Sequence, residues 1–533
     1  MSASGRAGSA ARQGAVTSSA VPVSLPRPQH VPAYPLAELA VRLGADPTPV
    51  RGIAVTGVTH ASGAVRPGDL FAALPSLAGD RHGARYAPAA AAAGAAAVLT
   101  NPAGAALVAP TGLPALVVPD PRAVLGEVAA QIYGEPGTRL QVIGVTGTAG
   151  KTSTVYLIEA GLRAAGRKPA LLSTVETRLD DLVLESVRTT PEATDLHALL
   201  AAALERGVDA VAMEVSSHAL ALERVGGLRY AAGGWTNLGQ DHLDFHRDLT
   251  DYYAAKAKLF DGRCRVEILN ADDPALRDLT RSTTVTFSAE GDQAATWYAT
   301  DVVAQGYGQR FIAHGPAGAV PAGVAQPGRH SVANALLAIA ALDAVGVPPE
   351  VAAKGVAACT GVPGRLEVVA GHDGGTLGVV DYAHKPDAVV AALTALTPVV
   401  RGRGGRLICV IGAGGERDPG KRPHMGASAA RLADLLIVTD DNPRSEDPAR
   451  IRAAVLSGVG TGVRARELSG HRPPEVIEIA GRRAAIEAAA RRAGPADVVA
   501  VLGKGHERGQ EIAGEVHPFD DRTVLAEALG GAG

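Results

Sequence analysis

Short apolar runs alternate with longer, Ala-rich or amphipathic segments along most of the chain after residue 139. The runs at 140–146, 208–215, 265–270, 376–382, 406–412, 433–439 and 497–503 have the length of buried strands. Segments 152–166, 448–456 and 481–494 have the length and composition of helices. Strands that alternate with helices predict βαβ units and mostly parallel sheets, so the predicted fold class is α/β. Ligands of such sheets gather at the carboxyl ends of the strands, and most polar clusters of this chain directly follow an apolar run.

Changes in composition suggest how the chain is divided. Residues 1–30 are rich in Ser, Ala, Gly and Pro and lack a continuous apolar run, which predicts a disordered leader and not a signal peptide. The Ala-rich N-terminal part ends near Thr138, and a second series of βα units begins near Pro363. We therefore predict three domains after the leader. They are an N-terminal α/β domain at 31–138, a central parallel-sheet domain of the P-loop ATPase kind at 139–362, and a C-terminal Rossmann-like domain at 363–533.

Composition excludes several classes of protein. The 533 residues carry a formal net charge of −3 and only 3% aromatic residues, which argues against a nucleic-acid partner. No apolar run reaches the roughly 18 residues that a membrane span needs. Cys264, Cys359 and Cys409 lie far apart, which fits a reducing cytoplasm and excludes a zinc ribbon or a disulfide scaffold. We expect a cytoplasmic monomer that neither inserts into membranes nor binds nucleic acid.

The stretch "GVTGTAGKTST", residues 144–154, joins a predicted strand to a predicted helix. Gly147 and Gly150 lack a Cβ, so the backbone can turn tightly and direct its N–H groups at an anion, where the positive end of the helix dipole also lies. Lys151 supplies a full charge for terminal phosphates, and the hydroxyl of Thr152 is suited to Mg²⁺. Val145 replaces the first Gly of the strict Walker pattern, and the alternative is an ordinary Gly-rich turn.

Three further stretches carry candidate chemistry. Glu214 ends an apolar run, where a P-loop enzyme places a Mg²⁺ ligand, although a solvated acid is the alternative. His242 and His246 have i, i+4 spacing, but the Glu of a zinc HExxH motif is missing, so we interpret His246 as structural. Lys256 falls on an amphipathic segment, where a lysine is usually solvated.

These stretches together resemble the Mur ligase family. The resemblance rests on "TGTAGKTST", "MEVSSH", "TNLGQDHLDFH" and "DYYAAKAKLF" and covers roughly residues 53–529. It implies an ATP-dependent ligase that joins a carboxylate to an amine through an acyl phosphate. Ala149 replaces the Asn common in the family's loop, a change that a mainly backbone cradle tolerates. The ATP-binding residues implied by the resemblance are Gly147, Thr148, Ala149, Gly150, Lys151, Thr152, Asn334, Arg365 and Asp381, with His384 on the same side.

The resemblance also implies the catalytic set and the metal. Thr152, Glu214 and His242 are the expected Mg²⁺ ligands, and Lys151, Glu214, His242 and Lys256 are the expected catalytic residues. The position of Lys256 is carbamylated in the family (N6-carboxylysine), which turns a cation into an anion. Because only a neutral amine attacks carbon dioxide, this modification requires a lysine with a lowered pKa. Lys385 stands where the family more often has Thr, and we assign it no role.

Matches to the family also indicate where the first substrate binds. "VRPGDLFAAL" resembles the family's UDP-binding domain, although its "DSR" is replaced by "ASG" at 61–63, with only Ser62 retained. The residues expected to bind UDP-MurNAc-dipeptide are Ser62, Thr189, Thr190, Ser216, Arg224 and Lys256.

The loop "VTDDNPRSEDP", residues 438–448, follows a predicted strand and is either a plain turn or a reader of a charged ligand. It matches the pocket of the family member that adds meso-diaminopimelate. Arg444 and Arg417 can clamp the distal carboxylate of this amino acid, and Glu507 and Asp441 can accept from its ammonium. The expected diaminopimelate-binding residues are Arg417, Asp441, Asn442, Pro443, Arg444, Gly503 and Glu507.

Two kinds of alternative remain at this stage. Within the family, the alternatives are a ligase that adds L-lysine and a folate polyglutamylase. The string "DNPR" argues against lysine, and the UDP-domain pattern argues against folate. Outside the family, the alternative is a P-loop regulatory protein that binds ATP without catalysing a ligation. The grouping of Glu214, His242 and Lys256 with the phosphate loop argues against that alternative.

Overall fold

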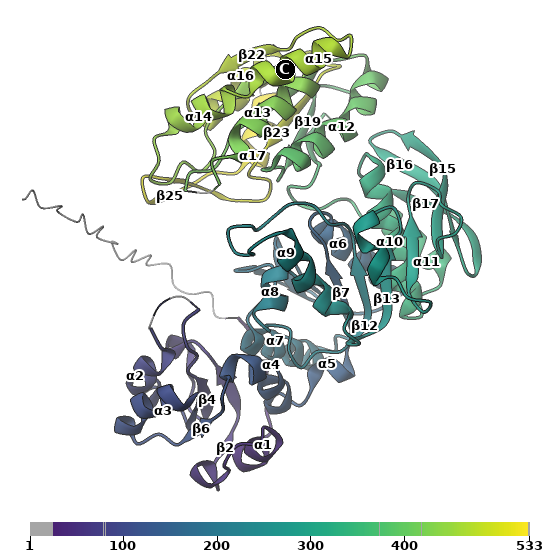
Figure 1. Ribbon diagram of the computed structural model, residues 1–533. Helices are drawn as coiled ribbons and strands as arrows, with labels where there is room; N and C mark the ends of the chain where they lie inside the picture. Colours follow the sequence, from purple (N-terminus) through teal and green to yellow (C-terminus); the bar gives the residue numbers. More distant parts are fainter. Residues whose placement is uncertain (1–24, 78, 80, 372–373, 417, 531–533) are drawn as a thin grey trace, which may run out of the picture.

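The computed structural model describes residues 25–77, 79, 81–371, 374–416 and 418–530. Three main sheets follow one another along the chain, and each falls within one of the three predicted domain ranges. In Figure 1 the N-terminal and C-terminal parts lie at opposite ends of the central part. None of the helices in the described part of the chain has both the length and the apolar character that crossing a bilayer requires.

The N-terminal part contains a parallel sheet in the order β3-β4-β5-β6. Its helices α4 and α1 pack with this sheet into an apolar core that also takes in Ala198 and Ala201 of the central part. The bounds are β1 Tyr34–Pro35, α1 Leu36–Arg42, β2 Ala54–Val55, β3 Gly57–Thr59, β4 Asp69–Ala72, α2 Ala87–Ala92, β5 Ala97–Thr100, α3 Pro102–Val108, β6 Ala115–Val117 and α4 Pro121–Ile132.

The leader predicted for residues 1–30 extends too far toward the C-terminus. Residues 1–24 lie outside the described residues, but residues 25–30 are packed against the protein. Leu25 contacts the apolar core of the central part, and Arg27 forms an ion pair of 2.7 Å with the nearly buried Asp69. The backbone N–H groups of Gln29 and His30 donate to the carboxylate of Glu205. Residues 25–30 are held in place because Asp69 of the N-terminal part and Glu205 of the central part accept hydrogen bonds from them.

The central part is built on an eleven-stranded sheet in the order β10-β9-β8-β11-β7-β12-β13-β14-β15-β16-β17. The strands from β8 to β15 are parallel, and antiparallel strands extend the sheet at both edges. The strand bounds are β7 Gln141–Thr146, β8 Pro169–Leu172, β9 Glu176–Leu179, β10 Leu182–Glu185, β11 Ala210–Glu214, β12 Tyr230–Trp235, β13 Cys264–Asn270, β14 Val285–Ser288, β15 Trp297–Gln305, β16 Gly308–Gly315 and β17 Gly318–Val324.

Helices cover both faces of this sheet. Successive side chains of β7 point to opposite faces, so Ile143 packs with α6 and α10 while Val142 packs with α7 and α8. Burial on both faces explains why the strands are continuous apolar runs and not alternating ones. The helix bounds are α5 Pro136–Arg139, α6 Lys151–Ala164, α7 Ala193–Glu205, α8 Ser217–Ala221, α9 Leu249–Ala257, α10 Arg329–Ala344 and α11 Pro349–Ala358.

The C-terminal part contains a six-stranded sheet in the order β18-β19-β23-β20-β21-β22, parallel except for β18. Apolar cores lie on both faces, one shared with α12, α13 and α14 and the other with α16 and α17. The bounds are β18 Glu367–Ala370, β19 Leu377–Asp381, α12 Pro386–Arg403, β20 Leu407–Ile411, α13 Lys421–Leu432, β21 Leu435–Val438, α14 Pro448–Leu456, α15 Val459–Leu468, β22 Glu475–Glu478, α16 Arg482–Arg492, β23 Val498–Leu502, β24 Gly509–Ile512, β25 Glu515–Pro518 and α17 Asp521–Gly530.

The predicted fold class is confirmed, and every predicted strand and helix named above is present within a few residues. The sequence patterns did not predict the strands β15 to β17, which pair antiparallel with one another, or the β24–β25 hairpin. The domain boundaries at 138/139 and 362/363 stay predictions.

Candidate active site

The phosphate loop lies between β7 and α6, at the carboxyl end of the central sheet. Gly147 has φ of +141°, and a Cβ there would lie 1.9 Å from the hydroxyl oxygen of Thr236. A Cβ on Gly150, at φ of +87°, would lie 2.4 Å from the side-chain oxygen of Asn334. Both positions therefore need glycine, for the backbone conformation and for the close approach of a neighbour.

Residues that follow β12 hold this loop in shape. Asn237 accepts a hydrogen bond of 3.0 Å from the N–H of Ala149 and donates one of 3.1 Å to its carbonyl. The hydroxyl of Thr236 donates to the same carbonyl at 2.6 Å. All these bonds reach the backbone of Ala149, so the loop keeps its conformation whatever the side chain at 149 is. Sequence reasoning did not single out Thr236 or Asn237.

Two lysines reach the same carbonyl of the loop. The ammonium groups of Lys151 and Lys256 each lie 2.8 Å from the carbonyl oxygen of Gly147. Burial lowers the pKa of Lys151, and the carboxylate of Glu214 opposes that shift. Lys256, at the end of α9, is 1% exposed. Its burial, strengthened by the neighbouring charge of Lys151, lowers its pKa well below the ordinary value, which is the condition that carbamylation requires.

The acid and hydroxyl groups predicted to hold Mg²⁺ come from two neighbouring strand ends. Thr152 lies in the first turn of α6, which follows β7, and Glu214 ends β11, the strand beside β7; both residues are buried. No group of three or more His, Cys, Asp or Glu side chains within the described residues forms a cage for a metal ion. This donor set fits Mg²⁺, which is usually held by one or two protein oxygens together with substrate phosphates and water.

His242 lies after β12 in a left-handed backbone conformation with φ of +53°. Its Nε2 is 3.1 Å from Asp241, and its ring packs edge-on against His218. Burial lowers the pKa of His242 to about 4, so the ring is neutral and can act as a ligand. His246 is buried, and its ring nitrogens lie 3.0 Å from the hydroxyl of Ser217 and 3.4 Å from Asp251, which is the environment of a structural histidine.

A hydrogen-bonded chain of hydroxyl groups connects Glu214 to the predicted dipeptide residues. Thr174 donates to Glu214 from its backbone N–H at 2.7 Å and lies 3.0 Å from the hydroxyl of Thr189. Thr190 lies 3.3 Å from Ser216 and donates to the carbonyl of Glu214 at 2.9 Å. The structure thus brings both threonines and Ser216 to Glu214, the predicted metal-binding acid. Thr174 was missed in the sequence because it belongs to no motif.

The remaining dipeptide residues are further from this chain. Arg224 forms an ion pair of 2.9 Å with Glu192, while its Nη1 points to the carbonyl of Thr190 at 3.5 Å. Its Nε is buried without a partner in the described structure, so the guanidinium keeps an unused donor. Ser62 begins a short 3₁₀ helix of the N-terminal part, and it is half-buried. Its contact with a uridine nucleotide stays a prediction.

Arg365 and Asp381, two of the predicted ATP-binding residues, lie in the C-terminal part. Asp381 ends β19 and accepts from the backbone N–H groups of Leu366 and Ala383 at 2.7 and 2.8 Å. Burial raises the pKa of Asp381, and the charge of Arg365 opposes that shift. Arg365 lies over the ring of Tyr382, with 4.5 Å between the guanidinium carbon and the ring centre.

One side chain from the C-terminal part reaches into the phosphate site. Lys385, at the start of α12, forms an ion pair with Asp241, the neighbour of His242. The charge of Lys385 also contributes to the lowered pKa values of Lys151 and Lys256, after burial in both cases. No role was predicted for Lys385, because its partner lies in a different part of the chain.

The loop after β21 forms the predicted amino-acid pocket. Arg444 has φ of +54° and donates from Nη1 to the carbonyl of Gly415 at 2.5 Å. A Cβ on Gly503, at φ of +123°, would lie 2.5 Å from the carboxylate of Asp441, so glycine leaves room for that buried carboxylate. Arg417, predicted to clamp the same ligand group as Arg444, lies outside the described residues.

A buried lysine organises the other side of this pocket. Lys504 is 0% exposed and donates to the side-chain oxygen of Asn442 at 2.9 Å and to Glu507 at 3.1 Å. Asn442 in turn donates to Glu507 at 2.9 Å. Lys504 therefore fixes the orientation of the Asn442 amide and offsets part of the charge of Glu507. The signal for it was present, since Lys504 stands between two predicted residues of one motif.

A fully buried ion pair holds the carboxyl ends of β21 and β23, next to the predicted amino-acid-binding residues. Arg482 pairs with Asp521 through two hydrogen bonds of 2.7 and 2.6 Å, and both side chains are 0% exposed. The same guanidinium donates to the carbonyls of Asp440 and Leu502, directly beside Asp441 and Gly503.

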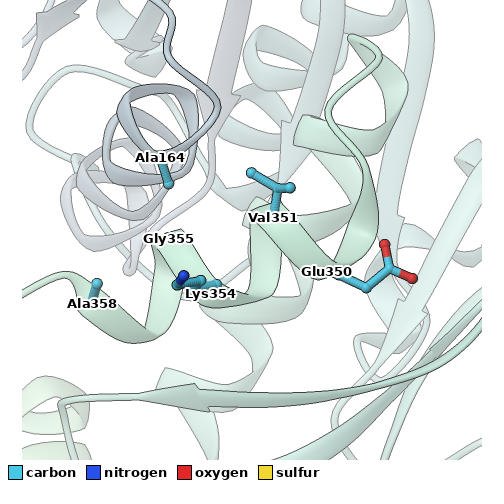
Figure 2. A pocket seen from close by; sticks show the side chains of 6 residues that line it. All are labelled: Ala164, Glu350, Val351, Lys354, Gly355 and Ala358. Atoms are coloured by element: carbon cyan, nitrogen blue, oxygen red, sulfur yellow. The ribbon is translucent and has the colours of Figure 1, made fainter.

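A separate depression between α6 and α11 contains none of the predicted residues. It is lined by Ala164, Glu350, Val351, Lys354, Gly355 and Ala358 (Figure 2). Ala164 ends α6 and Lys151 begins it, so about 20 Å of helix separate this depression from the phosphate loop. Its lining is mostly apolar, and Glu350 and Lys354 are the charged residues in it.

Comparisons with known proteins show what the chain is similar to. The Mur ligase middle domain matches residues 145–342, and the Mur ligase glutamate ligase domain matches residues 364–505. A UDP-N-acetylmuramoyl-L-alanyl-D-glutamate–2,6-diaminopimelate ligase of Streptomyces avermitilis is 53% identical over 511 residues, which cover 95% of this chain and 98% of the relative. The enzyme of the same name from Corynebacterium glutamicum is 45% identical over 470 residues, covering 86% and 89%.

A solved structure also shares the fold. The structure of a UDP-N-acetylmuramoyl-L-alanyl-D-glutamate–2,6-diaminopimelate ligase superposes with a TM-score of 0.65 at 30% sequence identity. The superposition covers 94% of this chain and 99% of the other. The similarity thus includes all three sheets.

Proposed function

This chain belongs to the Mur ligase family, and on that premise we propose that it adds meso-diaminopimelate to the D-Glu γ-carboxylate of UDP-MurNAc-L-Ala-D-Glu. The reaction is driven by ATP and yields ADP and phosphate. The observation that carries the proposal is the position of Arg444, at a strand end of the C-terminal part beside Asn442 and Asp441. A guanidinium there is complementary to the distal carboxylate that distinguishes diaminopimelate from lysine.

In the first step, an oxygen of the D-Glu γ-carboxylate attacks the γ-phosphorus of ATP, and the bond to the bridging oxygen of ADP breaks. Backbone N–H groups of the loop around Gly147 and Gly150 cradle the phosphates, and Lys151 neutralises charge on the phosphoryl oxygens. Lys151 is free for this task once its hydrogen bonds to the loop carbonyls of Gly147 and Thr148 are exchanged for phosphate.

Mg²⁺, when bound through Thr152, Glu214 and His242, would supply charge neutralisation at the phosphates. The buried Glu214 is oriented for this by Thr174. Thr189, Thr190 and Ser216 lie next to it and are suited to position the dipeptide carboxylate for attack. Carbamylation of Lys256 would add an anion beside the loop and remove one of the two cations that crowd the carbonyl of Gly147.

In the second step, the free amine of diaminopimelate attacks the acyl carbon, phosphate leaves and the amide forms. The ammonium first gives a proton to solvent to reach its nucleophilic form, and the nitrogen loses a second proton to solvent as phosphate leaves. The C-terminal part positions the amino acid through Arg444 and the Asn442–Glu507 pair. The ion pair of Lys385 with Asp241, a neighbour of Lys151 in the central part, supports binding of ATP between the two parts. We place the enzyme in the cytoplasm as a monomer, with ATP and Mg²⁺ required.

Release of phosphate tests this function. It should require ATP, UDP-MurNAc-L-Ala-D-Glu and meso-diaminopimelate together. Release that proceeds equally with L-lysine, or without any amine, would refute the assignment.

A further inference from the structure

The guanidinium of Arg444 already has a carboxylate partner within the protein. Its Nε lies 3.2 Å from Oε2 of Glu511, and its Nη1 donates to the carbonyl of Gly415. Glu511 belongs to β24, in the hairpin that the sequence patterns did not predict. The group expected to recognise the distal carboxylate of the substrate is therefore neutralised by an acid of the chain itself.

The backbone holds Glu511 in this place. Its carbonyl accepts from the N–H of Arg444 at 3.0 Å, and its N–H donates to the side chain of Asn442 at 3.0 Å. The carbonyl of Arg444 in turn accepts from the N–H of Ala513 at 2.6 Å. These bonds join the hairpin to the pocket loop on both sides of the carboxylate, so Glu511 is a tethered competitor at high effective concentration.

The ion pair between Arg444 and Glu511 is weak enough for a substrate carboxylate to displace Glu511. The side chain of Arg444 is 20% exposed and that of Glu511 is 39% exposed, so solvent screens their attraction. A ligand carboxylate that pairs with the guanidinium through two parallel hydrogen bonds can displace the Glu511 carboxylate, which lies 3.2 Å from Nε. Since Glu511 is partly in water, it needs no other partner after displacement.

We propose that Glu511 is a specificity-determining residue, an internal carboxylate that occupies Arg444 until the distal carboxylate of the amino-acid substrate displaces it. This inference rests on the proposed function and adds a consequence for selectivity. A site rejects an analogue most strongly when the analogue leaves a buried charge unpaired. With L-lysine in the pocket, Glu511 stays paired with Arg444 and removes that penalty. Glu511 therefore weakens diaminopimelate binding and also softens the rejection of lysine.

The variant Glu511→Gln tests this directly, because it keeps the shape and the backbone bonds and removes the competing charge. We expect KM for meso-diaminopimelate to fall about two- to fivefold, the range that a partly exposed ion pair permits, with kcat and KM for ATP unchanged. The ratio of kcat/KM for diaminopimelate over L-lysine should rise by a similar factor. A KM that is unchanged or raised would overturn the inference.

The matched control is Glu515→Gln, on the partner strand β25. Glu515 is exposed, and its side chain lies 3.9 Å from His517 and not at the pocket. The control should leave every constant unchanged; a fall in KM equal to that of Glu511→Gln would assign the effect to net charge and overturn the inference. Failure of the wild-type chain to release phosphate with diaminopimelate would instead refute the proposed function, so the two failures are distinguishable.

Discussion

Lys385 of the C-terminal part and Asp241 of the central part form an ion pair close to the phosphate loop. The side chains are 26% and 10% exposed, so solvent screens the pair only in part. Asp241 also contacts His242, a predicted metal ligand. The pair thus links the position of the C-terminal part to the charge balance of the ATP site.

Replacing Lys385 should weaken ATP binding. Lys385→Ala removes the ion pair between the two parts and one positive charge near the phosphates. We expect KM for ATP to rise about three- to tenfold while KM for diaminopimelate changes less than about twofold. The control Lys354→Ala, on α11 at the distant depression of Figure 2, should change neither constant. Equal changes in the two variants would show that only overall charge matters.

The phosphate loop should not tolerate a methyl group at residue 150. In Gly150→Ala the new Cβ would collide with Asn334, and φ of +87° would strain the backbone. We expect ATP binding, measured by calorimetry, to weaken by about tenfold or more, since each such strain costs on the order of 1–3 kcal/mol. Gly402→Ala, on α12 with open space around it, serves as control and should bind ATP normally. Normal binding by Gly150→Ala would mean that the loop does not hold the phosphates.

Lys256 should carry carbon dioxide at neutral pH. Its lowered pKa increases the neutral, nucleophilic fraction of the amine, and this fraction grows further as the pH rises. With ¹³C-bicarbonate, NMR should show a carbamate signal that disappears in Lys256→Arg. The signal should persist in Lys258→Arg, since Lys258 is 43% exposed and paired with Glu223. A signal that survives in Lys256→Arg would locate the carbamate elsewhere.

The buried ion pair Arg482–Asp521 should stabilise the ends of β21 and β23, beside the predicted amino-acid-binding residues. Arg482→Ala leaves Asp521 as a buried, unpaired charge, so we expect a loss of about 3–5 kcal/mol in the C-terminal part. Hydrogen exchange of the β21 and β23 amides measures this loss. Arg483→Ala, which breaks the exposed pair with Glu527, should cost less than about 0.5 kcal/mol. Similar costs for the two variants would contradict the structural account.

The sequence allowed much of the fold to be predicted and indicated most residues of the candidate site, for identifiable reasons. The central and C-terminal strands are buried on both faces, so they appear as apolar runs, and the polar loops that follow them carry short motifs. The β24–β25 hairpin has no such signature, since its second strand is exposed throughout. Glu511 and Lys385 were missed because each meets its partner only through the tertiary fold. Spacing along the chain contains no information about such contacts.

Arg444 should determine the choice of amino acid. Arg444→Ala removes the partner of the distal carboxylate, and a hydrogen bond to a charged group contributes about 1.5–3 kcal/mol. KM for diaminopimelate should therefore rise about tenfold or more, while KM for ATP stays within about twofold. Arg450→Ala, a solvent-exposed arginine on α14, should leave both unchanged. Equal effects of Arg444→Ala on the two substrates would reduce the loop to an ordinary turn.

The central claim is tested most directly by phosphate release from the purified wild-type chain. The assay contains ATP, Mg²⁺ and UDP-MurNAc-L-Ala-D-Glu, with either meso-diaminopimelate or L-lysine as the amine. The account predicts rapid release with diaminopimelate, little release with L-lysine and none without an amine. Equal release with both amino acids, or release that needs no amine, would contradict it.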